Sequence, residues 1–159
     1  MQIKILCVGK LKESYFIQAI EEFQKRLSRF VTLEIREIPD EKAPDSLSPA
    51  QEQQVMEKEG RRILEKIGPG EHVIPLCIGG KQYDSLAFSS HLQDLMDSGK
   101  SRITFVIGGS LGLSPQVIAR GNETLSLSRM TLPHRIARLV LLEQLFRAFK
   151  IQNNETYHK

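Results

Sequence analysis

The segment VIGGSLGLS, residues 106–114, contains a Gly-x-Ser-x-Gly pattern that is typical of the nucleophile elbow of a hydrolase. In such an elbow the helix begins almost at the serine, but here the helix-start pair Ser114-Pro115 stands four residues beyond Ser110. The chain after Ser110 contains no aspartate, so the acid of a catalytic triad would have to be Glu123, Glu143 or Glu155. This spacing disfavours a serine hydrolase.

The same glycines do not fit the common phosphate-binding motifs. A dinucleotide fingerprint would need glycine at position 110, and no Gly-Lys-Ser/Thr follows as a Walker loop requires. A glycine pair at the end of an apolar run lets a flat ligand approach the backbone, and a branched side chain at Gly108 would then fill the ligand's place. The alternative is a tight strand-to-helix turn without a ligand.

Two other segments strengthen the ligand interpretation. Residues 76–80 and 126–134 end predicted strands, and in an open α/β sheet such ends share one edge. Together the three segments offer backbone groups and apolar side chains but few charges, which suits an adenine ring better than a triphosphate.

The histidines and cysteines show no metal-ligand spacing, and we expect no metal. We interpret His72 and His91 as structural or surface residues. His134 differs because it follows Pro133 at a helix start, where the helix dipole favours a neutral imidazole that can act as a base. Cys7 and Cys77 lie in apolar runs and are expected to be unreactive packing residues rather than a disulfide.

The elements that position these residues follow an α/β pattern, which predicts a mostly parallel sheet with helices on both faces. Strands are expected over 2–8, 32–38, 72–78, 102–107 and 124–128. Helices are expected over 16–30, from Ser48-Pro49 to about 68, over 85–97, from Ser114-Pro115, and over 133–150. We expect one domain over 1–159. The last helix is apolar around much of its circumference, which predicts that it also packs on a partner subunit, as a homodimer.

Composition excludes some classes of protein. The longest apolar runs have four residues, far too few to span a bilayer, and no signal peptide is evident, so we expect a cytoplasmic protein. Residues 81–159 carry 10 Lys and Arg against 6 Asp and Glu, which permits contact with a polyanion. A solvated basic helix face would give the same composition.

Several ordered segments carry a resemblance to a known family. VIGGSLGL, LSLSRMTLPH, RLVLLEQLFRAFK and the terminal ETYHK resemble the bacterial ribosomal RNA large subunit methyltransferase H family of the SPOUT class. KILCVGKLKESYF and IPDEKAP extend the similarity to the N-terminal half. The resemblance implies an α/β fold with a C-terminal trefoil knot, a homodimer, and methyl transfer from S-adenosylmethionine to N3 of a pseudouridine in the helix 69 loop of 23S rRNA, at the family's position 1915.

The resemblance also implies roles for individual residues. Cofactor contacts fall on the three segments found above, at Leu76, Gly108, Leu127, Ser128, Arg129, Met130, Thr131 and Leu132. His134 is the first candidate for the base that accepts or orients the N3 proton, and His158 with Tyr157 on the tail is the second. Candidate rRNA phosphate ligands are Arg129, Arg135, Arg138 and Lys159, with Lys81 as a weaker one.

A rival hypothesis comes from another class of protein. A non-catalytic RNA-binding module on a flavodoxin-like sheet would also explain the basic C-terminal half. Binding of S-adenosylmethionine discriminates between the two hypotheses. For the tail, residues 155–159, we expect closure over the RNA base at a site shared between protomers, because Tyr can stack on an unpaired base and His can exchange a proton.

Overall fold

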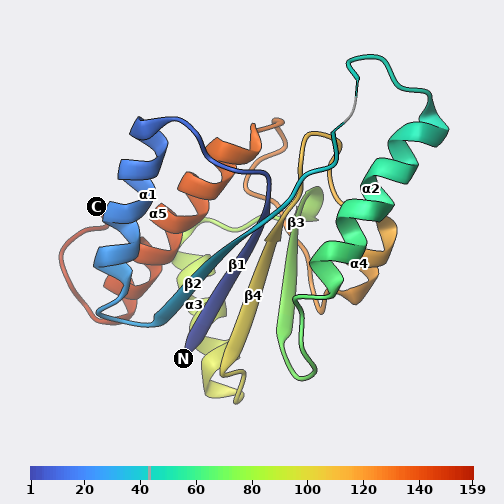
Figure 1. Cartoon of the computed structure of the whole chain (residues 1–159). Coiled ribbons are helices and arrows are strands. Elements are labelled where there is room, and N and C mark those ends of the chain that lie inside the picture. Colours follow the sequence, from blue (N-terminus) through green and yellow to red (C-terminus); the bar gives the residue numbers. More distant parts are fainter. Residues whose placement is uncertain (43) are drawn as a thin grey trace.

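The computed structural model describes residues 1–42 and 44–159. Its sheet has four parallel strands, β1 (Gln2–Val8), β2 (Thr32–Ile38), β3 (His72–Lys81) and β4 (Arg102–Ile107). Their order is β2-β1-β4-β3, so the two central strands are β1 and β4 (Figure 1). Both central strands are mostly apolar and largely buried, as expected for parallel strands that are covered on both faces.

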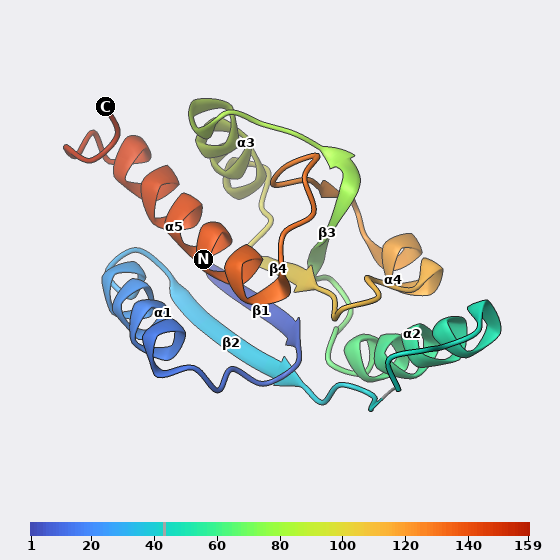
Figure 2. The same cartoon turned by 90° about the horizontal axis from the view of Figure 1, so that it is seen from above.

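Helices cover both faces of the sheet, as predicted. One face carries α1 (Ser14–Leu27), α3 (Ser85–Asp97) and α5 (His134–Gln152), and the other carries α2 (Pro49–Leu64) and α4 (Pro115–Arg120) (Figure 2). The larger apolar core lies on the α1, α3 and α5 face, and a smaller one lies beneath α2 and α4. The predicted α/β fold class is confirmed, and the trefoil knot implied by the resemblance stays a prediction.

Local sequence signals explain where the helices begin. The predicted capping box at α2 is present, because Gln51 N donates to Ser48 Oγ at 3.2 Å and Ser48 N donates to Gln51 Oε1 at 2.9 Å. Asp84 caps α3, and Ser114 caps α4 ahead of Pro115. The bounds of α3 are those predicted, whereas α2 ends four residues earlier than expected.

The predicted strand over 124–128 is wrong. Only Leu125 bridges to β3, through isolated pairings with Leu76 and Lys81. Lys81 N donates to Thr124 O at 3.2 Å, and Ser126 N donates to Lys81 O at 2.9 Å. The segment therefore touches the edge of the sheet at one point and then leaves it as irregular backbone. The apolar pattern of this segment resembles that of a strand because Leu125 is buried in the core.

The apolar circumference of α5 does not by itself require a partner subunit, and the predicted dimer through this helix stays a prediction. Helix α5 packs between α1 and α3 and over β1 and β4, so its own chain covers most of its circumference. Leu142 and Leu145 are fully buried in one protomer, and a charged substitution there would disrupt the core rather than test an interface. No helix in the described part of the chain is long and apolar enough to cross a membrane.

Candidate functional site

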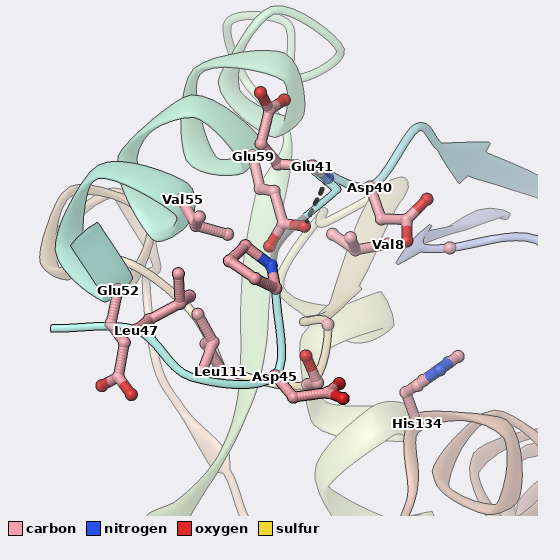
Figure 3. Close-up of a pocket in the computed structure, with 14 residues that line it drawn as sticks. Val8, Asp40, Glu41, Asp45, Leu47, Glu52, Val55, Glu59, Leu111 and His134 are labelled. Atoms are coloured by element: carbon pink, nitrogen blue, oxygen red, sulfur yellow. Dashed lines mark hydrogen bonds between the residues drawn. The ribbon is translucent and has the colours of Figure 1, made fainter.

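The sheet has a topological switch point between β1 and β4. From β1 the chain crosses to β2 on one side, whereas β4 is reached from β3 on the other side. In open α/β sheets ligands bind in the crevice outside the carboxyl ends of the strands at such a point. A pocket of about 400 Å³ lies there (Figure 3).

Four parts of the chain line this pocket. Val8 and Gly9 end β1, the loop after β4 contributes Gly109, Ser110 and Leu111, and His134 begins α5. The α2 helix and the segment before it supply the remaining lining residues, which are Asp40, Glu41, Pro44, Asp45, Leu47, Glu52, Val55 and Glu59. The pocket is therefore rich in carboxylates, with apolar side chains between them.

Glu59 is the most enclosed carboxylate of the pocket, at 5% exposure. It points from α2 toward the backbone of Glu41, whose N–H donates to Glu59 Oε2 at 2.9 Å (Figure 3). Burial raises the pKa of the Glu59 carboxyl above its usual value. Sequence reasoning missed this residue, although it occupies an apolar stripe position between Val55 and Ile63, and a glutamate there is a signal for a buried carboxylate.

A neighbouring carboxylate of the pocket is already paired. Glu41 accepts from Arg62 at 2.5 Å and lies 3.6 Å from the Lys58 ammonium. The hydrogen bond from Arg62 lowers the pKa of Glu41, so this side chain stays ionised. The two carboxylates thus have different environments, because Glu59 is desolvated and Glu41 is paired with cations.

His134 reaches the pocket from the first residue of α5, on the side opposite α2 (Figure 3). Burial lowers the pKa of its imidazole, and the neighbouring Arg135 and Arg138 lower it further. Burial and the two arginines, rather than the helix dipole invoked from the sequence, thus favour the neutral imidazole. Its Nδ1 is buried and has no hydrogen-bond partner among the described residues.

The structure brings together the three segments that were predicted to hold a cofactor. Pro75 pairs with Val106, so Leu76 and Gly108 lie close together on neighbouring strands. The bridge from Leu76 to Leu125 brings the segment 127–132 to the same edge. Leu76, Leu127 and Leu132 are partly buried and pack against the core. These three segments form what we call the cofactor edge.

The glycines of this edge serve the fold of the chain itself. A Cβ on Gly108 would lie 2.8 Å from the carbonyl carbon of Gly112. A side chain at this position would therefore clash with the chain's own backbone, and not with a ligand as expected from the sequence. Gly112 closes this turn by donating to Gly109 O at 3.1 Å, with φ at +85°. A Cβ on Gly80 would lie 2.7 Å from the backbone of Leu125. Both glycines permit close backbone approach between loops.

The cofactor edge offers apolar side chains and backbone groups to a ligand. Within the described residues, the backbone N–H groups of Leu127, Arg129, Thr131 and Leu132 donate no hydrogen bond, so they are available to a ligand. Half-buried leucines beside these donors supply apolar contact. An adenine ring needs this combination of apolar contact and hydrogen-bonding backbone.

Sequence reasoning also missed how the cofactor edge is anchored. Glu123 bonds His72 Nε2 through Oε2 at 2.8 Å and His91 Nε2 through Oε1 at 2.5 Å. Asn122 N donates to Val73 O, and Val73 N donates to Asn122 Oδ1, each at 2.8 Å. His72 and His91 are therefore structural residues, as interpreted from the sequence. They hold the start of the 121–132 segment against β3 and α3.

The candidate RNA ligands have different surroundings. Arg129 is exposed, and Arg135 pairs with Glu13 at 2.9 Å while remaining partly exposed. Lys81 is exposed and lies 4.8 Å from the ring centroid of Tyr83. Met130 beside Arg129 is 76% exposed.

Arg138 does not fit its predicted role. It is 2% exposed, and it donates to Glu37 at 2.9 Å and to Gly9 O at 3.3 Å. The guanidinium therefore joins α5 to the ends of β1 and β2 and does not face solvent. Its spacing from Leu141, Leu142 and Leu145 matches the apolar stripe of the helix, which is a sequence signal for this burial.

The C-terminal tail is tied down at the far end of α5. Tyr157 packs edge to face on Phe146 with ring centroids 4.9 Å apart, and its hydroxyl donates to Glu143 at 3.2 Å. His158 Nδ1 lies 3.2 Å from an Arg147 nitrogen, Glu155 pairs with Arg29, and Lys159 is exposed. Helix α5 has 19 residues, and about 1.5 Å of rise per residue separates its ends by roughly 28 Å. Within one protomer, the tail and His134 therefore belong to different places.

Among the described residues, no group of three or more His, Cys, Asp or Glu side chains has an arrangement that holds a metal ion. Burial raises the pKa of Cys7 to about 12, which agrees with an unreactive packing residue.

Comparisons with known proteins agree with this geometry. A family model described as "Predicted SPOUT methyltransferase" matches residues 1–158. Proteins named "Ribosomal RNA large subunit methyltransferase H" from Exiguobacterium sibiricum, Enterococcus faecalis and Bacillus cytotoxicus are 54%, 55% and 57% identical to this chain. Each match covers 100% of both chains.

A solved structure supports the fold alone. "The structure of a probable methylase family protein from Haemophilus influenzae Rd KW20" superimposes with a TM-score of 0.56 at 15% identity, covering 99% of this chain and 70% of that one. Taken with the full-length relatives, these findings show that the chain belongs to the SPOUT methyltransferases and, within them, to the ribosomal RNA large subunit methyltransferase H family.

Proposed function

We propose that this protein transfers a methyl group from S-adenosylmethionine to N3 of a pseudouridine in the helix 69 loop of 23S rRNA, on assembled ribosomes in the cytoplasm. The observation that carries the proposal is full-length identity above one half with proteins named as ribosomal RNA large subunit methyltransferases H. The backbone-lined cofactor edge supports it, because an RNA-binding module without activity has no need for such an edge.

The cofactor edge holds the proposed cofactor. Leu76, Gly108 and the segment 127–132 supply apolar contact and unpaired backbone N–H groups to the adenosyl part. When bound, S-adenosylmethionine supplies an activated methyl group, so the reaction needs no covalent nucleophile from the protein. The protein's own task is to align the acceptor nitrogen and to accept its proton.

Two groups of residues serve that task from opposite ends of α5. His134 is neutral near pH 7 and borders the switch-point pocket, which suits a proton acceptor. Tyr157 and His158 lie a full helix length away in the same protomer. We therefore propose a homodimer in which the tail of one protomer, after release from its packing on Phe146, serves the site of the other.

We propose that exposed residues at the start of α5 and in the loop before it contact the partner subunit or the RNA. Met130 and Ile136 flank Pro133 and are exposed apolar side chains, unlike Leu142 and Leu145. The proposed phosphate ligands are Arg129, Arg135 and Lys159, with Lys81 as a weaker one. Arg138 is buried and cannot reach a phosphate.

Calorimetry separates this proposal from the RNA-module rival. We expect saturable binding of S-adenosylmethionine without added metal, and binding of the demethylated product at the same site. A heat trace and a melting curve that do not respond to millimolar S-adenosylmethionine would favour the RNA module instead.

A further inference from the structure

The floor of the switch-point pocket is kept free of side chains by two glycines. A Cβ on Gly109 would lie 3.2 Å from Val8 Cγ1 and 3.3 Å from Glu59 Oε1, so any side chain there would press on both walls. A Cβ on Gly9 would lie 3.4 Å from His134 Cε1. The space between the strand ends, Glu59 and His134 thus depends on these glycines.

The walls of the pocket suit a small flat group. Val8, Val55 and Leu111 provide apolar surface around the floor. The volume of about 400 Å³ lies within the range of small-ligand sites. Gly109, Ser110 and Leu111 line the pocket immediately after Gly108, so the pocket and the cofactor edge share one loop.

The polar groups of the pocket are mainly hydrogen-bond acceptors. Glu59 Oε2 accepts from Glu41 N, whereas no donor among the described residues reaches Glu59 Oε1. Asp40, Asp45 and Glu52 add carboxylates around the exposed rim. A carboxylate oxygen that borders a pocket accepts readily from an N–H donor of a ligand. The ligand that fits best therefore brings N–H donors on a flat, otherwise apolar body.

Nucleobases differ in the number of such donors. Uracil in a nucleoside offers one ring N–H, at N3, because N1 carries the sugar. Pseudouracil is attached through carbon, so its N1–H is free as well and the base presents two ring N–H groups. An acceptor-rich pocket consequently discriminates between two bases of the same size.

We propose that the switch-point pocket receives the acceptor base and that Glu59 selects pseudouracil over uracil by accepting its additional N–H. This inference rests on the proposed function and assigns a specificity-determining residue to it. The competing occupant is a cationic group, such as a polyamine or an arginine side chain, which the rim carboxylates would also attract.

Binding without cofactor tests the selection directly. The full-length protein, labelled at Val and Leu methyls, is titrated with the nucleosides pseudouridine and uridine in separate NMR experiments. We expect saturable shifts at Val8, Val55 and Leu111, with pseudouridine bound about 10-fold more tightly, the value of one hydrogen bond to a charged group. Glu59→Gln should bring this preference close to 1, while Glu57→Gln, on the outer part of the same helix, should keep it.

One further variant and two cationic competitors sharpen the result. Gly109→Ala should weaken the binding of both nucleosides, because the added methyl occupies the floor of the pocket. Spermidine and arginine amide serve as cationic probes. Methyl shifts that respond to these probes and not to the nucleosides would overturn the proposal, as would a pseudouridine preference that survives Glu59→Gln in a protein with a normal melting curve.

Methyl transfer to ribosomes separates this inference from the proposed function. With ribosomes that carry pseudouridine or uridine at the acceptor position, Glu59→Gln should lower kcat/KM for pseudouridine about 10-fold and leave uridine nearly unchanged. If wild-type protein methylates ribosomes and Glu59→Gln retains full discrimination, only the role of Glu59 fails. If wild-type protein transfers no methyl group although the nucleosides bind selectively, the proposed function fails and the selectivity of the pocket stands.

Discussion

The two sides of the 108–112 loop are built in different ways. On the cofactor edge the available groups are backbone N–H groups and leucines, and close contacts between loops depend on Gly80 and Gly108. On the pocket side the groups are side chains, with Glu59 buried and His134 neutral. The first kind of site recognises a flat ring by shape, and the second can exchange protons. We therefore propose that the backbone side binds the cofactor and that the side-chain side serves the acceptor chemistry.

The largest effect is expected from Gly80→Ala, which should abolish binding of S-adenosylmethionine. The new Cβ would lie 2.7 Å from the Leu125 backbone, which must shift and carry the 124–132 segment with it. Gly79→Ala is the matched control, because nothing lies within 4 Å of a Cβ at that position. Calorimetry should show binding for Gly79→Ala and none for Gly80→Ala. Equal affinity in both variants would show that the cofactor does not bind at this edge.

Removal of the tail should separate chemistry from cofactor binding. A chain that ends at Asn154 should keep its dimer and most of its cofactor affinity, while methylation of ribosomes falls at least about 100-fold because a positioning element is lost. The melting temperature should fall slightly, since Tyr157 no longer packs on Phe146. A near-normal single-turnover rate would show that the tail has no part in catalysis.

His134→Gln should lower the rate of methyl transfer about 100-fold, as expected for loss of a general base, and leave cofactor affinity unchanged. Burial lowers the pKa of this imidazole below 6.5, so the wild-type rate should fall only on the acid side of that value. The variant should lose this acid limb in a pH–rate profile. If the limb persists, proton transfer belongs to another group, and His158 becomes the candidate.

The smallest effect concerns the stability of the pocket side. Because burial raises the pKa of Glu59, the folded state binds more protons than the unfolded state above the ordinary value of 4.5, and stability falls as pH rises through that window. Glu59→Gln removes this cost. Its melting temperature should exceed that of wild type at pH 7, and the difference should shrink toward pH 4. An equal difference at both pH values would contradict a buried, titrating Glu59.

The sequence predicted more of the backbone than of the side-chain chemistry. Four strands, the two layers of helices and the meeting of three loop segments follow from periodicity, caps and the rule that parallel strand ends share an edge. The 124–128 segment was mistaken for a strand because burial of Leu125 alone gives it an apolar pattern. Local pattern cannot distinguish one buried anchor residue from a paired strand.

Burial of charged residues was the harder part to predict. Arg138 and Glu59 occupy apolar stripe positions of their helices, but their partners, Glu37 and the backbone of Glu41, come from distant or irregular segments. The covering of α5 by α1 and α3 likewise depends on packing across the whole sheet, so an apolar helix was assigned to a partner subunit. These contacts are long-range in the sequence, and composition does not report them.

Transfer of a labelled methyl group tests the central claim most directly. Ribosomes from cells that lack this modification are incubated with the protein and tritiated S-adenosylmethionine, and the 23S rRNA is then digested and its nucleosides are separated. We predict one methyl group per ribosome, recovered as N3-methylpseudouridine from the helix 69 loop. Absence of label from rRNA, or label recovered at another nucleoside, would contradict the account.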